Sequence, residues 1–182
     1  MSTDNQLLSL IKLYPYKPWD WERLSCNPNI TMDFVNANPD TDGWKWSWEW
    51  LSCNPNITMD FVNANPDKPW NWGELSRNPN VTMDHVLANP NKPWHWYLLS
   101  SNPNITIDHV KENPDSDGRR WNWHGLAHNP NITMDHVRAN PDKPWRWSDL
   151  SNNPNITMDY IKTHADKPWR WDMLSINKFR SR

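Results

Sequence analysis

Three histidines recur at one position of a repeated sequence, and imidazole nitrogens are common zinc ligands. His85, His109 and His136 lie in three successive copies of the repeat. Zinc holds its nitrogen ligands at about 2.0 to 2.1 Å, whereas packed helices lie about 8 to 10 Å apart, so side chains from successive copies converge on one ion only with difficulty. The other copies carry aromatic rings at this position: Phe34, Phe61 and Tyr160. We therefore interpret the histidines as flat rings packed beside a helix and predict no metal site.

Two polar columns also recur, and both have structural explanations. The aspartates are Asp33, Asp60, Asp84, Asp108, Asp135 and Asp159. Each falls in the first turn of a predicted helix, where negative charge stabilises the helix dipole. The asparagines, each before a proline, are Asn27, Asn54, Asn78, Asn102, Asn129 and Asn153. Their amides are suited to capping turns, with hydrogen bonds between copies as an extension of that role. No phosphate loop, nucleophile arrangement or zinc spacing accompanies them, so we predict no enzymatic activity and no cofactor.

The tryptophans offer a second kind of chemistry, because flat rings can stack on bases or on prolines. All of the 16 tryptophans except Trp44 and Trp50 form two columns. The first column is Trp19, Trp46, Trp70, Trp94, Trp121, Trp145 and Trp169; the second is Trp21, Trp48, Trp72, Trp96, Trp123, Trp147 and Trp171. On a helix at 100° per residue, the second column faces the partner helix and the first faces elsewhere. An exposed first column would bind ligands, whereas a buried one would hold neighbouring repeats together. We favour the buried arrangement, because seven bare tryptophan faces would promote aggregation.

These columns are positioned by a unit of about 24 residues that runs from Lys17 almost to the end of the chain. In one copy, Pro69 suits a first helical turn and the residue before Pro79 ends that helix. Thr82 is a good N-cap for a second helix, which stops before Pro90. Each unit is thus predicted to hold two helices of about seven to nine residues. Such helices are too short to be stable alone, so the fold class is an all-α solenoid.

The repeat defines the predicted domain organisation. We expect one repeat domain over residues 1–182, with a cap helix over 1–16, six two-helix repeats over 17–166, and a half-repeat with a basic tail over 167–182. Two repeats carry three-residue insertions that contain Gly43 and Gly118. Either a three-repeat block was duplicated, or the superhelix makes about one turn in three repeats and stacks the two loops on one side.

The two cysteines, Cys26 and Cys53, occupy one position in adjacent copies. Because packed helices lie about 8 to 10 Å apart, we expect them to be too distant for a disulfide. Free thiols indicate a reducing compartment. The first 16 residues show neither a charged n-region nor a cleavage site, so we expect an intracellular protein that is not secreted and does not span a membrane.

Charge and variable positions suggest three functions. Residues 1–91 carry 6 basic and 11 acidic residues, and residues 92–182 carry 13 and 10. This asymmetry favours a scaffold that binds a protein partner or associates with itself head to tail. One alternative is single-stranded nucleic-acid binding through tryptophans and arginines, which the near-neutral net charge of −2 disfavours. The other is peptide binding in a solenoid groove. The candidate interaction residues are Trp44, Trp50, Tyr97, His124, Arg119, Arg120, Arg146 and Arg170.

The repeated string Asp-Lys-Pro-Trp-x-Trp-x-x-Leu-Ser-x-Asn-Pro-Asn-Ile-Thr-x-Asp resembles the tryptophan-rich repeat proteins of giant and other large DNA viruses, whose function is unassigned. The resemblance covers Lys17 to Ser175. It implies a host-cytoplasmic or virion setting and offers no catalytic residue to transfer. The chain departs from the pattern at His164-Ala165, in place of Asn-Pro, and at Ala127, in place of Ser, which weakens local caps.

Overall fold

The computed structural model describes residues 5–39, 44–114 and 121–179. These residues form fourteen short helices and no strand, which confirms the predicted all-α solenoid of two-helix repeats with a half-repeat at each end. They fall into two compact units, Met1–Pro93 and Trp94–Arg182. The predicted insertion loops at Gly43 and Gly118 lie outside the described residues.

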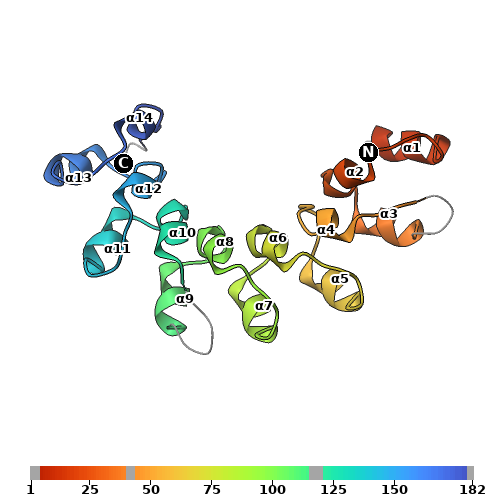
Figure 1. The fold of residues 1–182 in the computed structure, drawn as a ribbon, viewed down its shortest axis with the longest axis horizontal. Coiled ribbons are helices and arrows are strands. Elements are labelled where there is room, and N and C mark those ends of the chain that lie inside the picture. Colours follow the sequence, from red (N-terminus) through yellow and green to blue (C-terminus); the bar gives the residue numbers. More distant parts are fainter. Residues whose placement is uncertain (1–4, 40–43, 115–120, 180–182) are drawn as a thin grey trace. The chain divides into compact units, whose positions relative to one another are not determined.

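Within each unit, the first helices of successive repeats form one row and the second helices form another (Figure 1). The helices of the first unit are α1 (Gln6–Leu13), α2 (Trp21–Cys26), α3 (Met32–Ala37), α4 (Trp48–Leu51), α5 (Met59–Ala64), α6 (Trp72–Arg77) and α7 (Met83–Ala88). Those of the second unit are α8 (Trp96–Ser101), α9 (Ile107–Glu112), α10 (Trp123–His128), α11 (Met134–Ala139), α12 (Trp147–Leu150), α13 (Met158–Thr163) and α14 (Trp171–Leu174). The cap helix is α1, and α14 is the terminal half-repeat.

The first helix of each repeat begins later than the proline pattern predicts. Helix α6 begins at Trp72 rather than at Pro69, and Asn71 is its N-cap with extended backbone angles of φ −86° and ψ 98°. The Asn71 side-chain oxygen accepts a hydrogen bond from the Glu74 amide at 3.1 Å, which satisfies one N–H group of the first turn. The Lys-Pro-Trp segment is therefore a non-helical lead-in, in which the Trp70 backbone N–H donates to the Lys68 carbonyl at 2.8 Å. The repeat helices have four or six residues, not the predicted seven to nine. In the first helix of each repeat, the late start accounts for the difference.

The second helix of each repeat starts and stops where the sequence predicts. Helix α7 follows the N-cap Thr82 and ends at Ala88. His85 adds a contact that ring packing alone did not predict, because its Nδ1 accepts a hydrogen bond from the Thr82 backbone N–H at 3.1 Å. The same bond recurs at His109 with Thr106 and at His136 with Thr133. The histidine column thus completes capping boxes at helix starts.

The Asn-Pro-Asn column forms the predicted hydrogen-bond ladder between repeats. The Asn129 side chain is completely buried, and its amide nitrogen donates to the carbonyl oxygens of Ser100, Asn102 and Ile105 at 2.8, 2.9 and 3.0 Å. Its side-chain oxygen accepts from the Asn131 amide at 2.8 Å. Asn54, Asn78, Asn153 and Asn177 make related bonds to the preceding repeat. Each amide therefore closes its own turn and ties that turn to its neighbour.

A serine in the first helix links each repeat to the next lead-in segment. The Ser52 hydroxyl donates to the Trp48 carbonyl at 2.8 Å and accepts from the Asn71 amide at 2.9 Å. Equivalent acceptor bonds involve Ser25 with Ser47, Ser100 with Asn122, and Ser151 with Arg170. Ala127, which occupies this position in α10, has no hydroxyl and is completely buried. The predicted weakening at Ala127 therefore concerns an inter-repeat bond.

A glycine allows close helix packing in the second unit. A Cβ atom at Gly125 in α10 would lie 2.4 Å from the Tyr97 carbonyl oxygen and 2.8 Å from the Ser100 Cβ, both in α8. These separations are well below van der Waals contact. Only glycine therefore permits α10 to approach α8 in this way.

The expected separation of the two cysteines is wrong. The Sγ atoms of Cys26 and Cys53 lie 2.6 Å apart. The prediction used the distance between helix axes, but both cysteines lie at helix ends, next to the turns that the asparagine ladder draws together. Asn54, which follows Cys53, donates to the carbonyl oxygens of Ser25 and Asn27 on either side of Cys26, at 2.8 and 3.0 Å.

Candidate interaction surface

The first tryptophan column lies inside the repeats. The Trp70 ring is 8% exposed, and its indole N–H donates to the Asn65 carbonyl at 2.9 Å, at the end of the preceding helix. Trp46, Trp94, Trp121, Trp145 and Trp169 are likewise buried, whereas Trp19 is half-buried. Of the two arrangements expected from the sequence, the structure shows the buried one, although the 100° rotation does not apply to these residues because they precede the helix. The first column therefore holds repeats together and offers no row of bare rings.

The second tryptophan column is the more exposed one. Trp21, Trp48, Trp72, Trp96, Trp123 and Trp147 are half-buried, and Trp171 is 62% exposed. Five of these half-buried rings contact the first-column ring of the next repeat, and each contact is edge to face. Trp123 and Trp145, for example, have centroids 4.8 Å apart, and similar pairs are Trp21 with Trp46, Trp48 with Trp70, Trp96 with Trp121, and Trp147 with Trp169. The two columns thus form one interlocking aromatic contact.

The lysines of four Lys-Pro-Trp segments lie over a second-column ring of the preceding repeat. The Lys68 ammonium is 4.6 Å from the Trp48 ring centroid, and the same cation–π contact joins Lys92 to Trp72, Lys143 to Trp123, and Lys167 to Trp147. Trp44 occupies the lysine position in the second repeat and packs 5.5 Å from Trp21. Trp44, one of the candidate interaction residues, is therefore part of an intramolecular aromatic cluster.

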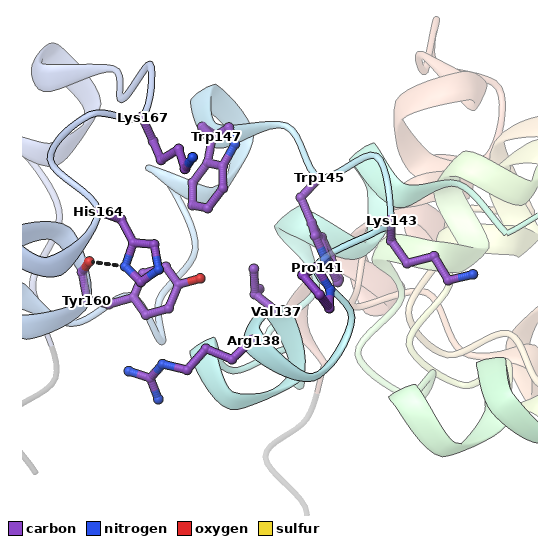
Figure 2. Close-up of a pocket in the computed structure, with 9 residues that line it drawn as sticks. All are labelled: Val137, Arg138, Pro141, Lys143, Trp145, Trp147, Tyr160, His164 and Lys167. Atoms are coloured by element: carbon purple, nitrogen blue, oxygen red, sulfur yellow. Dashed lines mark hydrogen bonds between the residues drawn. The ribbon is translucent and has the colours of Figure 1, made fainter.

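A cavity of about 370 Å³ opens beside α11 and α13 (Figure 2). Its apolar walls are Val137, Pro141, Trp145 and Trp147, and its polar groups are Arg138, Lys143, Tyr160, His164 and Lys167. His164 stacks on Tyr160 with ring centroids 4.1 Å apart, and the Arg138 guanidinium lies 4.9 Å from the Tyr160 ring. Burial raises the pKa of the Tyr160 phenol, although Arg138 opposes that effect. The phenol therefore stays protonated near neutral pH as a hydrogen-bond donor.

A matching cavity of about 330 Å³ lies one repeat earlier. It is lined by Val110, Lys111, Pro114, Trp121 and Trp123, which occupy the repeat positions of Val137, Arg138, Pro141, Trp145 and Trp147. Lys143 lines both cavities. The two pockets are thus copies of one pocket, one repeat apart. Sequence reasoning missed them, although the recurring Pro and Trp positions were visible in the repeat.

The cations around these pockets have carboxylate neighbours within the chain. Arg138 pairs with Asp135 at 2.6 Å, and Lys167 pairs with Asp166 at 3.1 Å. The hydrogen bond from Lys167 lowers the pKa of Asp166. Lys111 and Lys143 pair similarly with Asp108 and Asp142. The pocket edge therefore offers N–H donors with much of their charge balanced, which suits peptide carbonyls better than a row of phosphates.

The remaining candidate interaction residues that the structure describes lie on or beside several helices. Trp50 in α4 and Tyr97 in α8 are 43% and 38% exposed. His124 is half-buried and lies 3.2 Å from the Asp149 carboxylate of the next repeat. Arg146 and Arg170 are N-caps that make no side-chain capping bond, and Arg170 instead pairs with Asp172. Arg119 and Arg120 lie outside the described residues.

In the part of the chain that the structure describes, no group of three or more His, Cys, Asp or Glu side chains is arranged to hold a metal ion. Nor does any described helix have both the length and the apolar character that crossing a membrane requires.

Comparison of the chain with protein-family models, curated proteins and solved structures finds no match.

Proposed function

We propose that this chain is a non-enzymatic repeat scaffold that binds an extended, proline-rich segment of a protein partner. The observation that carries the proposal is the recurrence of one aromatic pocket, in register and one repeat apart, with Lys143 shared between the two copies. A single pocket would bind a small molecule equally well. A pair in register is suited to a ligand that itself repeats.

The spacing favours a polyproline II peptide. Neighbouring packed helices lie about 8 to 10 Å apart. A polyproline II helix rises about 3.1 Å per residue with three residues per turn, so equivalent side chains recur about every 9.3 Å. Every third residue of such a peptide would therefore meet the next pocket.

The chemistry of the pocket fits the same ligand. Proline rings pack well on aromatic walls, which Trp145 and Trp147 supply in one pocket and Trp121 and Trp123 in the other. A polyproline II backbone makes no internal hydrogen bonds, so its carbonyls need outside donors. Lys143, Lys167 and Tyr160 line the pocket and carry such donors.

Titration of the full chain with a decaproline peptide tests this proposal. We expect saturable shifts of a subset of indole N–H signals in ¹H–¹⁵N spectra, including that of Trp147. Lys143→Ala should weaken binding by about 3- to 10-fold, the range for one lost hydrogen bond. Lys162→Ala is the control, since Lys162 is exposed on α13 and is absent from both pocket linings. No indole shift at millimolar peptide, or equal losses in both variants, would refute peptide binding here.

A different observation favours self-association as a second function. Trp171 is 62% exposed, whereas the other second-column rings are half-buried. At the opposite end of the repeat array, Trp19 and Asn27 are half-buried where most of their counterparts are buried. A second copy that placed its Trp19 against Trp171 would reproduce the Trp147–Trp169 contact, and the acidic and basic halves would attract each other.

Sedimentation velocity at several salt concentrations tests self-association. We expect larger species at low salt and high protein concentration, and Trp171→Ala should abolish them without loss of stability because the ring is exposed. Trp50→Ala removes another exposed tryptophan and serves as the matched control. A monomer under all conditions would exclude this function while leaving peptide binding untouched.

A further inference from the structure

The chain has two cysteines, and the fold brings both to one place. Cys26 ends α2, and Cys53 follows α4 at the same position of the next repeat. Both are half-buried free thiols, with sulfur atoms 2.6 Å apart. A disulfide bond measures about 2.05 Å. The sulfur atoms therefore need to move only about half an ångström to bond.

The backbone around the thiols is already held in place. Asn54 binds the carbonyls of Ser25 and Asn27, which flank Cys26. Ser25 also accepts a hydrogen bond from the Ser47 amide at 3.0 Å, at the start of α4. Because these bonds fix the two turns against each other, the second thiol is presented to the first at high effective concentration. The sequence contains no other cysteine with which either thiol could pair.

We propose that Cys26 and Cys53 are a thiol-oxidation site, at which a low-molecular-weight disulfide such as oxidised glutathione converts the pair into an intramolecular disulfide that clamps two neighbouring repeats together. No other site in the chain can form this bond, because the sequence contains no third cysteine. The inference does not depend on peptide binding or self-association.

The reaction is two consecutive thiol–disulfide exchanges. One protein thiol loses its proton, and its thiolate attacks a sulfur of oxidised glutathione, which releases one glutathione thiolate and leaves a mixed disulfide. The second protein thiol then loses its proton and attacks the protein sulfur of that mixed disulfide, which releases the second glutathione. One oxidised glutathione is consumed and two reduced glutathiones form, so the two electrons removed from the cysteines end on glutathione.

The surroundings assign the first attack to Cys26. The Cys53 thiol donates a hydrogen bond to the Trp50 carbonyl at 3.0 Å. Burial raises the pKa of Cys53 to about 12, with further contributions from Cys26 and from the Glu74 carboxylate, while Arg77 acts in the opposite direction. Cys53 is therefore held as a thiol and is the poorer initial nucleophile. It becomes the resolving cysteine once Cys26 carries glutathione.

Intact-mass spectrometry of the full chain tests the site. After treatment of the reduced protein with oxidised glutathione, we expect a product that lacks two hydrogens, carries no glutathione and resists alkylation by iodoacetamide. Dithiothreitol should restore both alkylation sites. Closing a loop of this length should lower the unfolding equilibrium constant by about 400-fold on the chain-entropy model, measured in urea with and without dithiothreitol.

Two single variants test which cysteine reacts first. Cys53→Ser should accumulate the mixed disulfide on Cys26 faster than Cys26→Ser accumulates it on Cys53, and neither should show a redox-dependent urea midpoint. The proposal is overturned if the wild-type protein retains two alkylatable thiols, ends with two glutathiones, or forms disulfide-linked dimers instead. Equal glutathionylation rates in the two variants would overturn the assignment of Cys26 as first nucleophile.

Discussion

Removal of one ladder amide should destabilise the fold far more than an ordinary asparagine substitution. Asn129→Ala deletes a buried amide that donates to three carbonyls at 2.8 to 3.0 Å and accepts from the Asn131 amide at 2.8 Å. The amide has only two N–H bonds, so at least one hydrogen is shared, and the substitution removes about three hydrogen bonds in effect. Each is worth about 1 kcal/mol net, and the buried groups left unpaired add to the loss. We expect a fall of about 3 to 5 kcal/mol in the free energy of unfolding.

Urea unfolding followed by circular dichroism at 222 nm measures this loss. Asn152→Ala is the matched control, because Asn152 is an exposed asparagine beside the equivalent ladder residue of the next repeat. Its substitution should change the free energy of unfolding by no more than about 0.5 kcal/mol. A loss below about 1 kcal/mol for Asn129→Ala would refute the ladder as a main source of cohesion between repeats. A lower slope of the transition, rather than a lower midpoint alone, would show that the second unit unfolds separately.

Three substitutions test departures from the repeat. Ala127→Ser restores a hydroxyl that can accept a hydrogen bond from the Arg146 backbone N–H in the next lead-in segment, and it should stabilise the chain by about 1 kcal/mol. Ala139→Ser, at an exposed helix end, is the control and should not stabilise the chain. Arg146→Asn supplies the missing N-cap of α12 and should add about 1 kcal/mol, measured as an increase in the urea midpoint. Gly125→Ala should destabilise despite the higher helix propensity of alanine, because its Cβ would meet the Tyr97 carbonyl; a higher thermal midpoint would contradict that packing.

The second helix was predictable because its signals are local. Thr82 caps it, and the Asn89-Pro90 pair ends it, so neither boundary depends on tertiary contacts. The first helix was misplaced because Pro69 fits an N1 position as well as the non-helical turn that it occupies here. Asn71 marks the actual start of the helix. Like Asp20, Ser47 and Asn122, it lies between the two tryptophans of its repeat and is the N-cap of the helix that follows.

The candidate site depended on information that a single repeat does not contain. The Cys26–Cys53 contact arises from turns drawn together by Asn54, so the distance between helix axes was the wrong measure. The pockets are formed by two successive repeats, and their walls come from residues that also build the core. Predicting them requires the offset between neighbouring repeats, and the period alone does not specify that offset.

Comparison of the repeats with one another separates structural positions from positions that serve something else. Four of the seven residues between paired tryptophans are Asp, Ser or Asn and cap the helix that follows. At Arg146 and Arg170 that capping bond is absent in two successive repeats, at a cost of about 1 kcal/mol each. Arg146 lies between Trp145 and Trp147, both of which line the larger pocket. Arg146 itself is exposed and is absent from both pocket linings, so Arg146→Asn should stabilise the chain and leave decaproline binding unchanged.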